Sequence, residues 1–220
     1  THRQWEARTG HRILERYGMT ETNMNTSNPY AGDRRAGTVG TPLPGVSLRI
    51  CDATGAELPA GETGMIEVRG PNVFQGYWRM PEKTAEELRP DGFFITGDLG
   101  FIDSDGYVTI VGRARDLVIS GGLNVYPREV EMALDELPGI LESAVIGVPH
   151  PDLGEAVVAV VVPEPGTAPE PEAIRAALAG SLAPFKRPRH IAFRTALPRN
   201  TMGKVQKNAL RDELRGVFAP

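Results

Sequence analysis

The sequence has little cysteine, little net charge and no long apolar run, and each shortage excludes a class of protein. The single cysteine, Cys51, excludes a disulfide framework and a cysteine zinc site, and it favours a reducing cytoplasm. No apolar run approaches the roughly 20 residues that a membrane-spanning helix needs. A net charge of −4 argues against broad nucleic-acid binding. No Gly-x-Gly-x-x-Gly follows a predicted strand, which disfavours a dinucleotide-dependent dehydrogenase.

Glycine and proline are abundant instead, with 25 and 19 residues respectively. They indicate many turns and short elements, and they argue against a helix bundle. A length of 220 residues suits one large domain or two small ones, and it allows a buried core without disulfide or metal support. The chain opens without Met and without a signal-peptide apolar stretch, so we expect it to begin inside a larger protein.

The apolar pattern predicts two regions of different texture. The first is expected to contain helices at 2–8 and 81–88, a polar loop at 18–35, and strands at 11–17, 46–50, 64–69, 93–102 and 107–111. The second is expected to contain strands at 143–148, 155–162 and 189–193, and helices at 127–137, 172–182 and 206–215. The first pattern indicates the end of an α/β domain plus a small antiparallel β-unit. The second is typical of a compact α+β domain.

The most informative motif is Tyr-Gly-Met-Thr-Glu at 17–21, at the end of a predicted strand. Open α/β sheets bind ligands where a strand ends in a glycine-containing loop. The Thr20 hydroxyl can donate to a phosphate oxygen, and the Glu21 carboxylate offers the hard oxygen that Mg²⁺ prefers. The same residues also fit an ordinary polar turn in which Thr20 and Glu21 cap the next element.

Three further motifs could contact a nucleotide or an acid. The carboxylate of Asp98, in Thr-Gly-Asp, can accept two hydroxyl donors, as from a ribose, although an Asp-containing turn fits equally. Gly121 and Gly122 would let a ligand or a backbone approach closely, unless they only form a hairpin. Lys204 follows a glycine in a tight loop and can present a point charge to a phosphate or carboxylate, or it is simply solvated.

The order and spacing of these motifs resemble the adenylate-forming superfamily, which includes acyl-CoA synthetases, adenylation domains of peptide synthetases and firefly luciferase. The shared stretches cover essentially the whole chain: Tyr-Gly-x-Thr-Glu at 17–21, Gly-Glu-x-Gly at 61–64, Gly-Tyr at 76–77, Thr-Gly-Asp at 96–98, Gly-Arg-x-x-Asp at 112–116, Gly-Gly-x-Asn-x-x-Pro-x-Glu-x-Glu at 121–131 and Gly-Lys at 203–204. Within the superfamily, residues 15–27, 35–40 and 198–207 resemble malonyl-CoA synthetases, which also accept methylmalonate.

The resemblance implies α/β and α+β architecture. Residues 1–114 would form the C-terminal part of a large adenylation core, ending in a small β-barrel-like subdomain. Residues 115–220 would form a mobile C-terminal lid domain, with a hinge at Arg115 and Asp116, where relatives usually carry Lys or Asp in place of the arginine. The phosphate loop and most of the acid pocket of the family lie upstream, so we expect the chain alone to be inactive. Arg3 is a candidate partner for the free carboxylate of malonate.

The resemblance also assigns roles in the nucleotide site. Tyr17, followed by Gly18, would stack on adenine, Thr20 would touch the α-phosphate, and Glu21 would hold Mg²⁺. Two further residues would bind the ribose: Asp98 by accepting from both hydroxyls, and Arg113 by donating.

Other roles concern the acid and CoA. Lys204 would bridge the acyl carboxylate and the phosphate, and Gly121 would lie where the pantetheine tunnel narrows. Phe185, Arg187 and Arg189 would bind the CoA nucleotide, unless this basic stretch is only a solvated turn.

The implied activity is ATP-dependent ligation of malonate or methylmalonate to CoA through an acyl-AMP, with ATP, Mg²⁺ and coenzyme A as cofactors. The expected partners are the carboxylic acid, the missing N-terminal part of the core, and a lysine acetyltransferase acting on Lys204. Neither nucleic acid nor a membrane is expected. Two alternatives remain open: a ligase for another short or aromatic acid, and a non-catalytic module that binds CoA or a partner protein.

Overall fold

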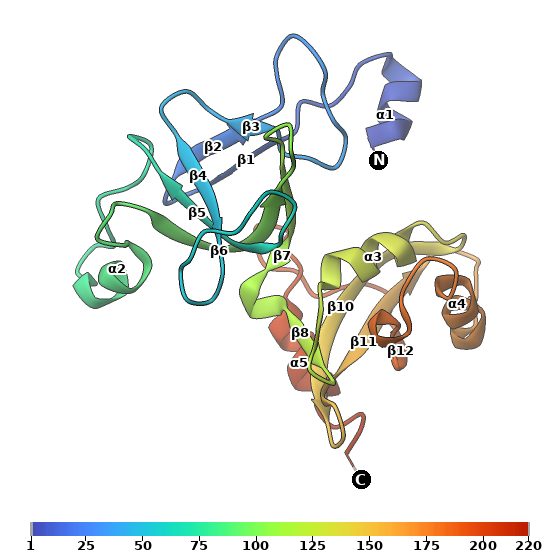
Figure 1. Ribbon diagram of the computed structural model, residues 1–220. Helices are drawn as coiled ribbons and strands as arrows, with labels where there is room; N and C mark the ends of the chain where they lie inside the picture. Colours follow the sequence, from blue (N-terminus) through green and yellow to red (C-terminus); the bar gives the residue numbers. More distant parts are fainter. Residues whose placement is uncertain (1, 220) are drawn as a thin grey trace. The chain divides into compact units, whose positions relative to one another are not determined.

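The computed structural model describes residues 2–219 and divides the chain into two compact units, Thr1–Ala114 and Arg115–Pro220. The first unit contains two antiparallel sheets and two short helices (Figure 1). Its elements are α1 (His2–Thr9), β1 (Arg16–Met19), β2 (Asn23–Ser27), β3 (Thr41–Pro42), β4 (Ser47–Cys51), β5 (Gly64–Arg69), α2 (Pro81–Glu87), β6 (Phe94–Ile102) and β7 (Val108–Arg113). The core and lid roles expected for the two units stay predictions.

The larger sheet of the first unit has the strand order β4-β5-β6-β7. Its alternating apolar side chains bury Ile50, Ile66, Val68 and Val108 together with Tyr17. The expected barrel-like subdomain is therefore an open sheet, because β4 and β7 do not pair within residues 2–219.

The first hairpin corrects the sequence analysis. A strand was expected at 11–17 and a loop at 18–35, but β1 covers only the end of the former, and β2 pairs with β1 in antiparallel fashion. The polar composition of β2 conceals a buried strand: Asn25 and Thr26 are fully buried. The Thr26 hydroxyl donates to the carbonyl of Val39 at 2.7 Å, so a polar side chain is satisfied inside the fold.

The second unit is a mixed sheet with helices on both faces. Its long hairpin β10–β11 is joined by β12, parallel to β11, and by the short hairpin β8–β9. Its elements are η1 (Ala114–Asp116, a 3₁₀ turn that starts at the unit boundary), β8 (Val118–Ser120), β9 (Leu123–Val125), α3 (Pro127–Asp135), β10 (Ile140–His150), β11 (Gly154–Pro163), α4 (Pro171–Leu178), η2 (Pro184–Lys186), β12 (His190–Phe193) and α5 (Lys207–Leu214).

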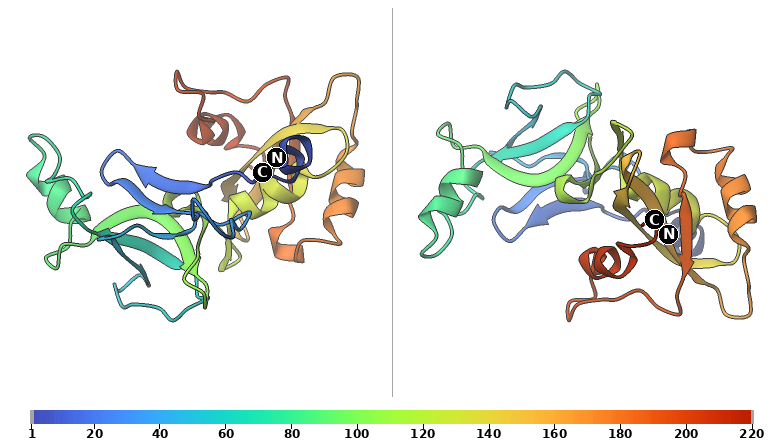
Figure 2. Two further views of the ribbon diagram at one scale, coloured as in Figure 1. Left: turned by 90° about the horizontal axis from the view of Figure 1, so that it is seen from above. Right: turned by 90° about the horizontal axis from the view of Figure 1, so that it is seen from below.

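Strand β11 shows why this sheet is stable. Its buried residues form a continuous run of valine and alanine, as expected for a strand buried on both faces. Val157 and Val161 pack with α3 and α4, whereas Val158 and Val160 pack with Leu210 of α5. The views agree that α3 and α4 cover one face and α5 the other (Figure 1, Figure 2).

Helices α2 and α3 begin at the expected residues, whereas α4 begins at Pro171, one residue before the expected start, and α5 at Lys207, one residue after it. Helices α2, α3 and α4 each start at a proline, whose missing N–H is not needed in the first turn. Helix α4 ends at Leu178, earlier than the expected 182, so its predicted end was wrong. Among residues 2–219, no helix combines the length and the apolar character required to cross a bilayer.

Candidate functional site

Three motifs that are distant in the sequence converge on Asp98 in the first unit. Asp98 is 4% exposed and lies in β6, directly opposite Arg113 of β7. The Tyr17 hydroxyl of β1 donates to Asp98 Oδ2 at 2.6 Å, and Arg113 Nε lies 2.7 Å from Oδ1. Both carboxylate oxygens are thus oriented by donors. A carboxylate held in this way is the kind of acceptor that ribose hydroxyls require.

Tyr17 is more buried than a stacking residue needs to be. Its exposed fraction is 8%, and its ring belongs to the core of the larger sheet. Burial first, and then the negative charge of Asp98, raise the pKa of the Tyr17 hydroxyl well above its ordinary value. The phenol therefore remains a hydrogen-bond donor to Asp98 throughout the physiological range. Stacking of Tyr17 on adenine stays a prediction.

Gly18 allows β1 and β2 to approach each other. A Cβ at this position would lie 2.0 Å from the carbonyl oxygen of Asn23, so no other residue fits without a backbone shift. The register of the hairpin also shifts between Tyr17 and Gly18. The observed role of Gly18 is therefore a close backbone contact, and its expected place beside the nucleotide stays a prediction.

Thr20 and Glu21 follow β1 and connect it to β2, and Thr20 is exposed. The Glu21 carbonyl accepts from the N–H of Phe74 at 2.8 Å, and Glu21 Oε1 accepts from the Tyr77 hydroxyl at 3.2 Å. The Phe74 ring in turn packs edge-on against Tyr77 and Phe94, with centroids 4.8 and 5.3 Å apart. Aromatic packing on β6 therefore fixes the segment that holds Glu21.

Asn72 completes this bracing segment, residues 72–77. Its Nδ2 lies 2.7 Å from the carbonyl oxygen of Thr22 and 3.1 Å from that of Met24. No role was expected for Gly-Tyr at 76–77, and Asn72 was not among the expected site residues. The Gly-Tyr motif was the available signal, because its tyrosine reaches Glu21.

Tyr77 lies between two carboxylates. Its hydroxyl is 2.6 Å from Glu87 Oε2 of α2, and Lys83 Nζ lies 2.5 Å from Glu87 Oε1. Burial, followed by the hydrogen bond to Glu87, raises the pKa of Tyr77. The neutral phenol thus separates Glu21 from Glu87, while Lys83 compensates the charge of Glu87.

The donor set at Glu21 fits a metal ion that arrives with a nucleotide. Mg²⁺ is usually bound by one or two carboxylates together with substrate phosphates. Within residues 2–219, no cluster of three or more His, Cys, Asp or Glu side chains could hold a metal by itself. A single carboxylate oriented by Tyr77 is compatible with this kind of binding, and the role of Glu21 in holding Mg²⁺ stays a prediction. Nothing is described for the side chain of Arg3, which lies outside the described set.

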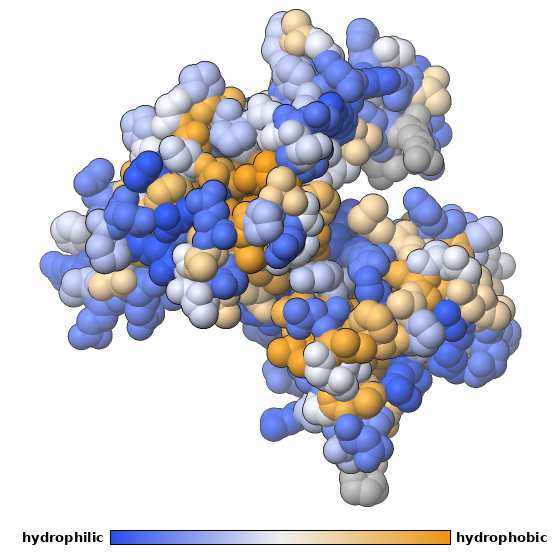
Figure 3. Space-filling view, viewed as in Figure 1, coloured by the Kyte–Doolittle hydropathy of each residue, from blue (hydrophilic) through white to orange (hydrophobic). Residues whose placement is uncertain are grey.

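In the second unit, Gly121 forms the turn between β8 and β9. Its φ of +58° lies in the left-handed region, and its N–H donates to the carbonyl of Leu153 at 2.9 Å. Two exposed apolar residues flank the turn, Ile119 and Leu123. Apolar surface is visible over this part of the unit (Figure 3). A glycine turn between apolar side chains could accommodate a thin, partly apolar ligand such as a pantetheine arm.

The expected hinge residues lie in the 3₁₀ turn η1 at the start of the second unit. Arg115 is exposed, whereas Asp116 accepts from Arg211 of α5 at 2.7 Å. Asp116 is thus anchored to its own unit, and the hinge role stays a prediction for both residues.

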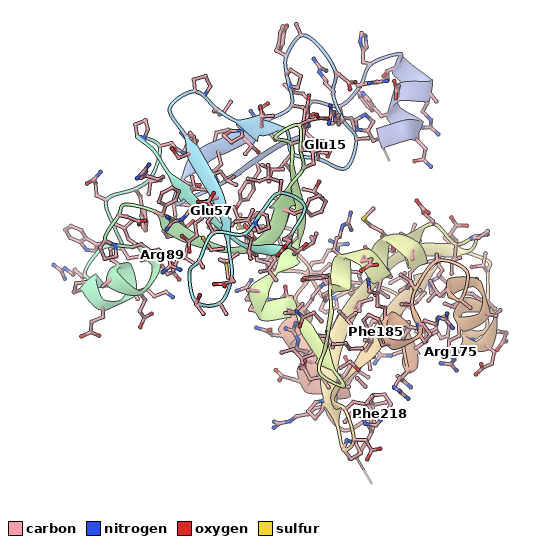
Figure 4. The ribbon with its side chains drawn as sticks, viewed as in Figure 1. Glu15, Glu57, Arg89, Arg175, Phe185 and Phe218 are labelled. Atoms are coloured by element: carbon pink, nitrogen blue, oxygen red, sulfur yellow. The ribbon has the colours of Figure 1, made fainter. Side chains whose placement is uncertain are left out.

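The basic stretch that was expected to bind the CoA nucleotide is partly engaged in contacts within the fold. Arg187 donates to the carbonyls of Leu182 and Ala179, just beyond α4, at 2.9 and 3.1 Å. Lys186 is occupied by both carboxylate oxygens of Glu129 at 2.7 Å. Phe185 (Figure 4) and Arg189 are exposed. Binding of a CoA nucleotide by Phe185, Arg187 and Arg189 stays a prediction, with Arg187 already serving the fold.

Lys204 lies in the loop before α5. Its backbone N–H donates to Asn200 Oδ1 at 2.9 Å, and its side chain is exposed. Within the described residues, no hydrogen bond or ion pair of its ammonium group is observed. The geometry therefore fits both a cation presented by a tight loop and a simply solvated lysine, and the role of Lys204 stays a prediction.

Family models and related proteins point to the same enzyme family. The model of the family described as AMP-binding enzyme matches residues 1–78, and that of the AMP-binding enzyme C-terminal domain matches residues 129–204. A malonate–CoA ligase from Arabidopsis thaliana is 43% identical over 222 residues, covering 96% of this chain and 36% of that protein. A sulfoacetate–CoA ligase from Cupriavidus necator is 42% identical over 208 residues, covering 94% and 41%.

A solved structure agrees closely. ATP-bound MatB from Rhodopseudomonas palustris matches with a TM-score of 0.95 and 62% identity, covering 99% of this chain and 43% of that one. The chain thus spans about two fifths of the length of these relatives. The likeness confirms the expected adenylate-forming fold class. The chain belongs to the family of AMP-binding, adenylate-forming enzymes.

Proposed function

We propose that the full-length protein is an ATP-dependent acid–CoA ligase whose acid is malonate or methylmalonate. The observation that carries this proposal is the convergence of Tyr17 and Arg113 on Asp98, an arrangement suited to a ribose. The identity of 43% with a malonate–CoA ligase supports the choice of acid. Because a sulfoacetate–CoA ligase is 42% identical, the acid needs a direct test.

The first half-reaction joins the acid to AMP. The acid carboxylate attacks the α-phosphorus of ATP, and pyrophosphate leaves. Two anions must meet, so positioned positive charge and hydrogen-bond donors lower the barrier. Thr20 would donate to the α-phosphate, and the Lys204 ammonium would bridge the carboxylate and the phosphate. Glu21 would hold Mg²⁺, which when bound neutralises phosphate charge.

The second half-reaction transfers the acyl group to CoA. The CoA sulfur attacks the acyl carbon, a C–S bond forms, and AMP leaves. Gly121, between exposed Ile119 and Leu123, would leave space for the pantetheine arm. Because Lys204 and Gly121 serve different half-reactions, residues 115–220 would act as a lid turning about Arg115 and Asp116, a gating step between two chemistries.

The proposal is tested by measuring AMP formation from ATP, Mg²⁺ and CoA with the full-length protein and a panel of acids. Malonate and methylmalonate should give acid-dependent AMP, whereas sulfoacetate and a long-chain fatty acid should give little. Robust turnover with either of the latter would replace the proposed acid. Absence of turnover with every acid would favour the non-catalytic CoA-binding alternative.

The same assay on the 220-residue chain tests the division of labour within the site. We expect no AMP above background, because the phosphate loop expected for the family has no counterpart in this sequence. Robust AMP formation by this chain would contradict that division.

A further inference from the structure

The loop that carries Lys204 is closed on itself by backbone contacts. Pro198 accepts from the N–H of Gln206 at 2.8 Å, and the N–H of Asn200 donates to the carbonyl of Lys204 at 2.9 Å. An isolated β-bridge pairs Arg199 with Val205 between these two contacts. The loop is therefore a small hairpin directly before α5, and Lys204 lies on its returning arm.

The side chain of Asn200 orders the tip of this hairpin. Its Oδ1 accepts from the N–H of Met202 at 3.0 Å and from that of Lys204 at 2.9 Å. Asn commonly closes turns through such bonds to backbone N–H groups two or more residues ahead. These contacts fix the shape of the tip, but they do not fix the hairpin on the sheet.

Apolar packing attaches the base of the hairpin, since Leu197 is buried in the core beside α5 and Val205 packs against it. Arg199 adds a polar connection at the Gly203–Lys204 end. Its Nη1 donates to the carbonyl of Gly203 at 2.7 Å, immediately before Lys204, and its Nη2 pairs with Glu142 of β10. The planar guanidinium can make both contacts at once because its donors have fixed directions. Glu142 belongs to the long β10–β11 ladder, where it pairs with Val162. The Gly203–Lys204 peptide is thus tied through Arg199 to the most extensive hairpin of the unit.

We propose that Arg199, oriented by Glu142, is a positioning residue that holds the Gly203–Lys204 peptide so that the Lys204 ammonium meets the acid and the α-phosphate. The inference rests on the adenylation role proposed above for Lys204. Arg199 itself would not contact the substrate. Its side chain is 44% exposed, so the ion pair adds little to folding stability, and the main consequence of its loss is a misplaced lysine.

Half-reactions measured separately on the full-length protein provide the test. Acid-dependent ATP–pyrophosphate exchange reports adenylation, and thioester formation from synthetic malonyl-AMP and CoA reports the second step. Arg199→Met should lower kcat for ATP–pyrophosphate exchange about tenfold or more, because a small displacement of a catalytic group lowers the reaction rate strongly. Thioester formation should stay within about twofold, because Lys204 does not act there.

Glu142→Gln and the double variant test whether the two residues act together. Glu142→Gln should slow exchange less than Arg199→Met, and the double variant should be no slower than Arg199→Met alone. Additive losses would overturn the proposed orientation of Arg199 by Glu142. The matched control is Arg175→Met, which removes another Arg–Glu surface pair, with Glu172 of α4, and should leave both half-reactions unchanged (Figure 4).

A second readout does not depend on turnover. In the 220-residue chain, Arg199→Met should accelerate amide hydrogen exchange at Gly203 and Lys204, while Arg175→Met should not. Equal slowing of both half-reactions by Arg199→Met would show a general structural role and overturn the inference. The inference would also be overturned if Arg199→Met changed neither the rate of ATP–pyrophosphate exchange nor the amide hydrogen exchange at Gly203 and Lys204.

Lys204→Ala separates failure of this inference from failure of the proposed function. If Lys204→Ala abolishes adenylation while Arg199→Met has no effect, only the positioning role is wrong. If Lys204→Ala leaves adenylation intact, the proposed role of Lys204 is wrong, and the positioning inference fails with it.

Discussion

At the scale of single residues, the central feature is a buried carboxylate with two unlike donors. Asp98 receives a neutral phenol on one oxygen and a guanidinium on the other. A buried charge is stable only when hydrogen bonds and an opposite charge replace its lost hydration. Tyr17 and Arg113 supply both. The geometry prepares Asp98 as an acceptor without leaving its charge uncompensated.

Removal of the phenol should therefore weaken both folding and nucleotide binding. Tyr17→Phe keeps the ring in the core but leaves Asp98 Oδ2 without this donor. We expect a loss of about 1–3 kcal/mol in the free energy of unfolding. In the full-length protein, the KM for ATP should rise. Urea denaturation measures the first effect, and Tyr30→Phe, at an exposed tyrosine, should change neither quantity.

The same residue predicts a dependence of stability on alkaline pH. The pKa of Tyr17 is raised in the folded chain above its ordinary value of 10.0, so the unfolded chain loses the phenol proton first. The contribution of the Tyr17 phenol to the free energy of unfolding is complete below about pH 10. It decreases as the pH rises further, by up to about 1.4 kcal/mol per pH unit. Denaturation between pH 9 and about 11 should show a shallower decline for Tyr17→Phe than for the parent chain. Parallel declines would contradict this origin.

At the scale of elements, turns and short segments position the functional groups, while the sheets supply a rigid support. The segment 72–77 braces the Glu21 turn from the side of β6. The hairpin before α5 presents Lys204. The β8–β9 turn presents Gly121. Each of these three segments is short, and each is attached to a sheet with a buried apolar core.

The β8–β9 turn should separate the two half-reactions. Gly121→Leu adds a side chain between two apolar residues, and its Cβ would lie 3.4 Å from Leu153 Cδ2. Thioester formation should fall about a hundredfold, because the pantetheine arm loses its space. Adenylation should change little.

Backbone strain needs its own control, since Gly121 has a positive φ. Gly166→Leu is matched, because Gly166 has a φ of +82° and open space around it. Both variants should lose similar stability in thermal denaturation, but only Gly121→Leu should lose thioester formation. Equal loss of thioester formation in both would indicate strain alone.

At the scale of the whole molecule, two units with separate cores carry different groups of the proposed chemistry. The first holds Thr20, Glu21 and Asp98, and the second holds Gly121 and Lys204. With the roles proposed above, a change at Lys204 alone would stop one half-reaction and spare the other. Acetylation is such a change, because it removes the positive charge.

Acetylation of Lys204 by a lysine acetyltransferase should abolish adenylation in the full-length protein, because the carboxylate and phosphate lose their shared cation. Thioester formation from synthetic malonyl-AMP should persist. Intact-mass analysis combined with both assays checks this outcome, and deacetylation should restore adenylation. Unchanged adenylation in fully acetylated protein would contradict the role of Lys204.

The sequence by itself determined the family, the order of the motifs and most of the regular elements. Valine-rich runs and helix-starting prolines act over a few residues, so β11 and the start of α3 could be predicted. The linear pattern also indicated that Lys204 is presented by a tight loop.

Only the tertiary structure decided which of these groups contact each other. The family resemblance placed Tyr17, Asp98 and Arg113 around one nucleotide, but strand pairing across the first unit brings Tyr17 and Arg113 onto Asp98, and no local pattern encodes such long-range pairs. Strand β2 was missed because its composition is polar, and the bond that allows Thr26 to be buried runs to a distant partner, Val39. Arg187 appeared free for CoA in the linear sequence, yet carbonyls that only the folded chain brings near it occupy its guanidinium. Hydrogen bonds between distant segments determine which polar residues remain available for a ligand.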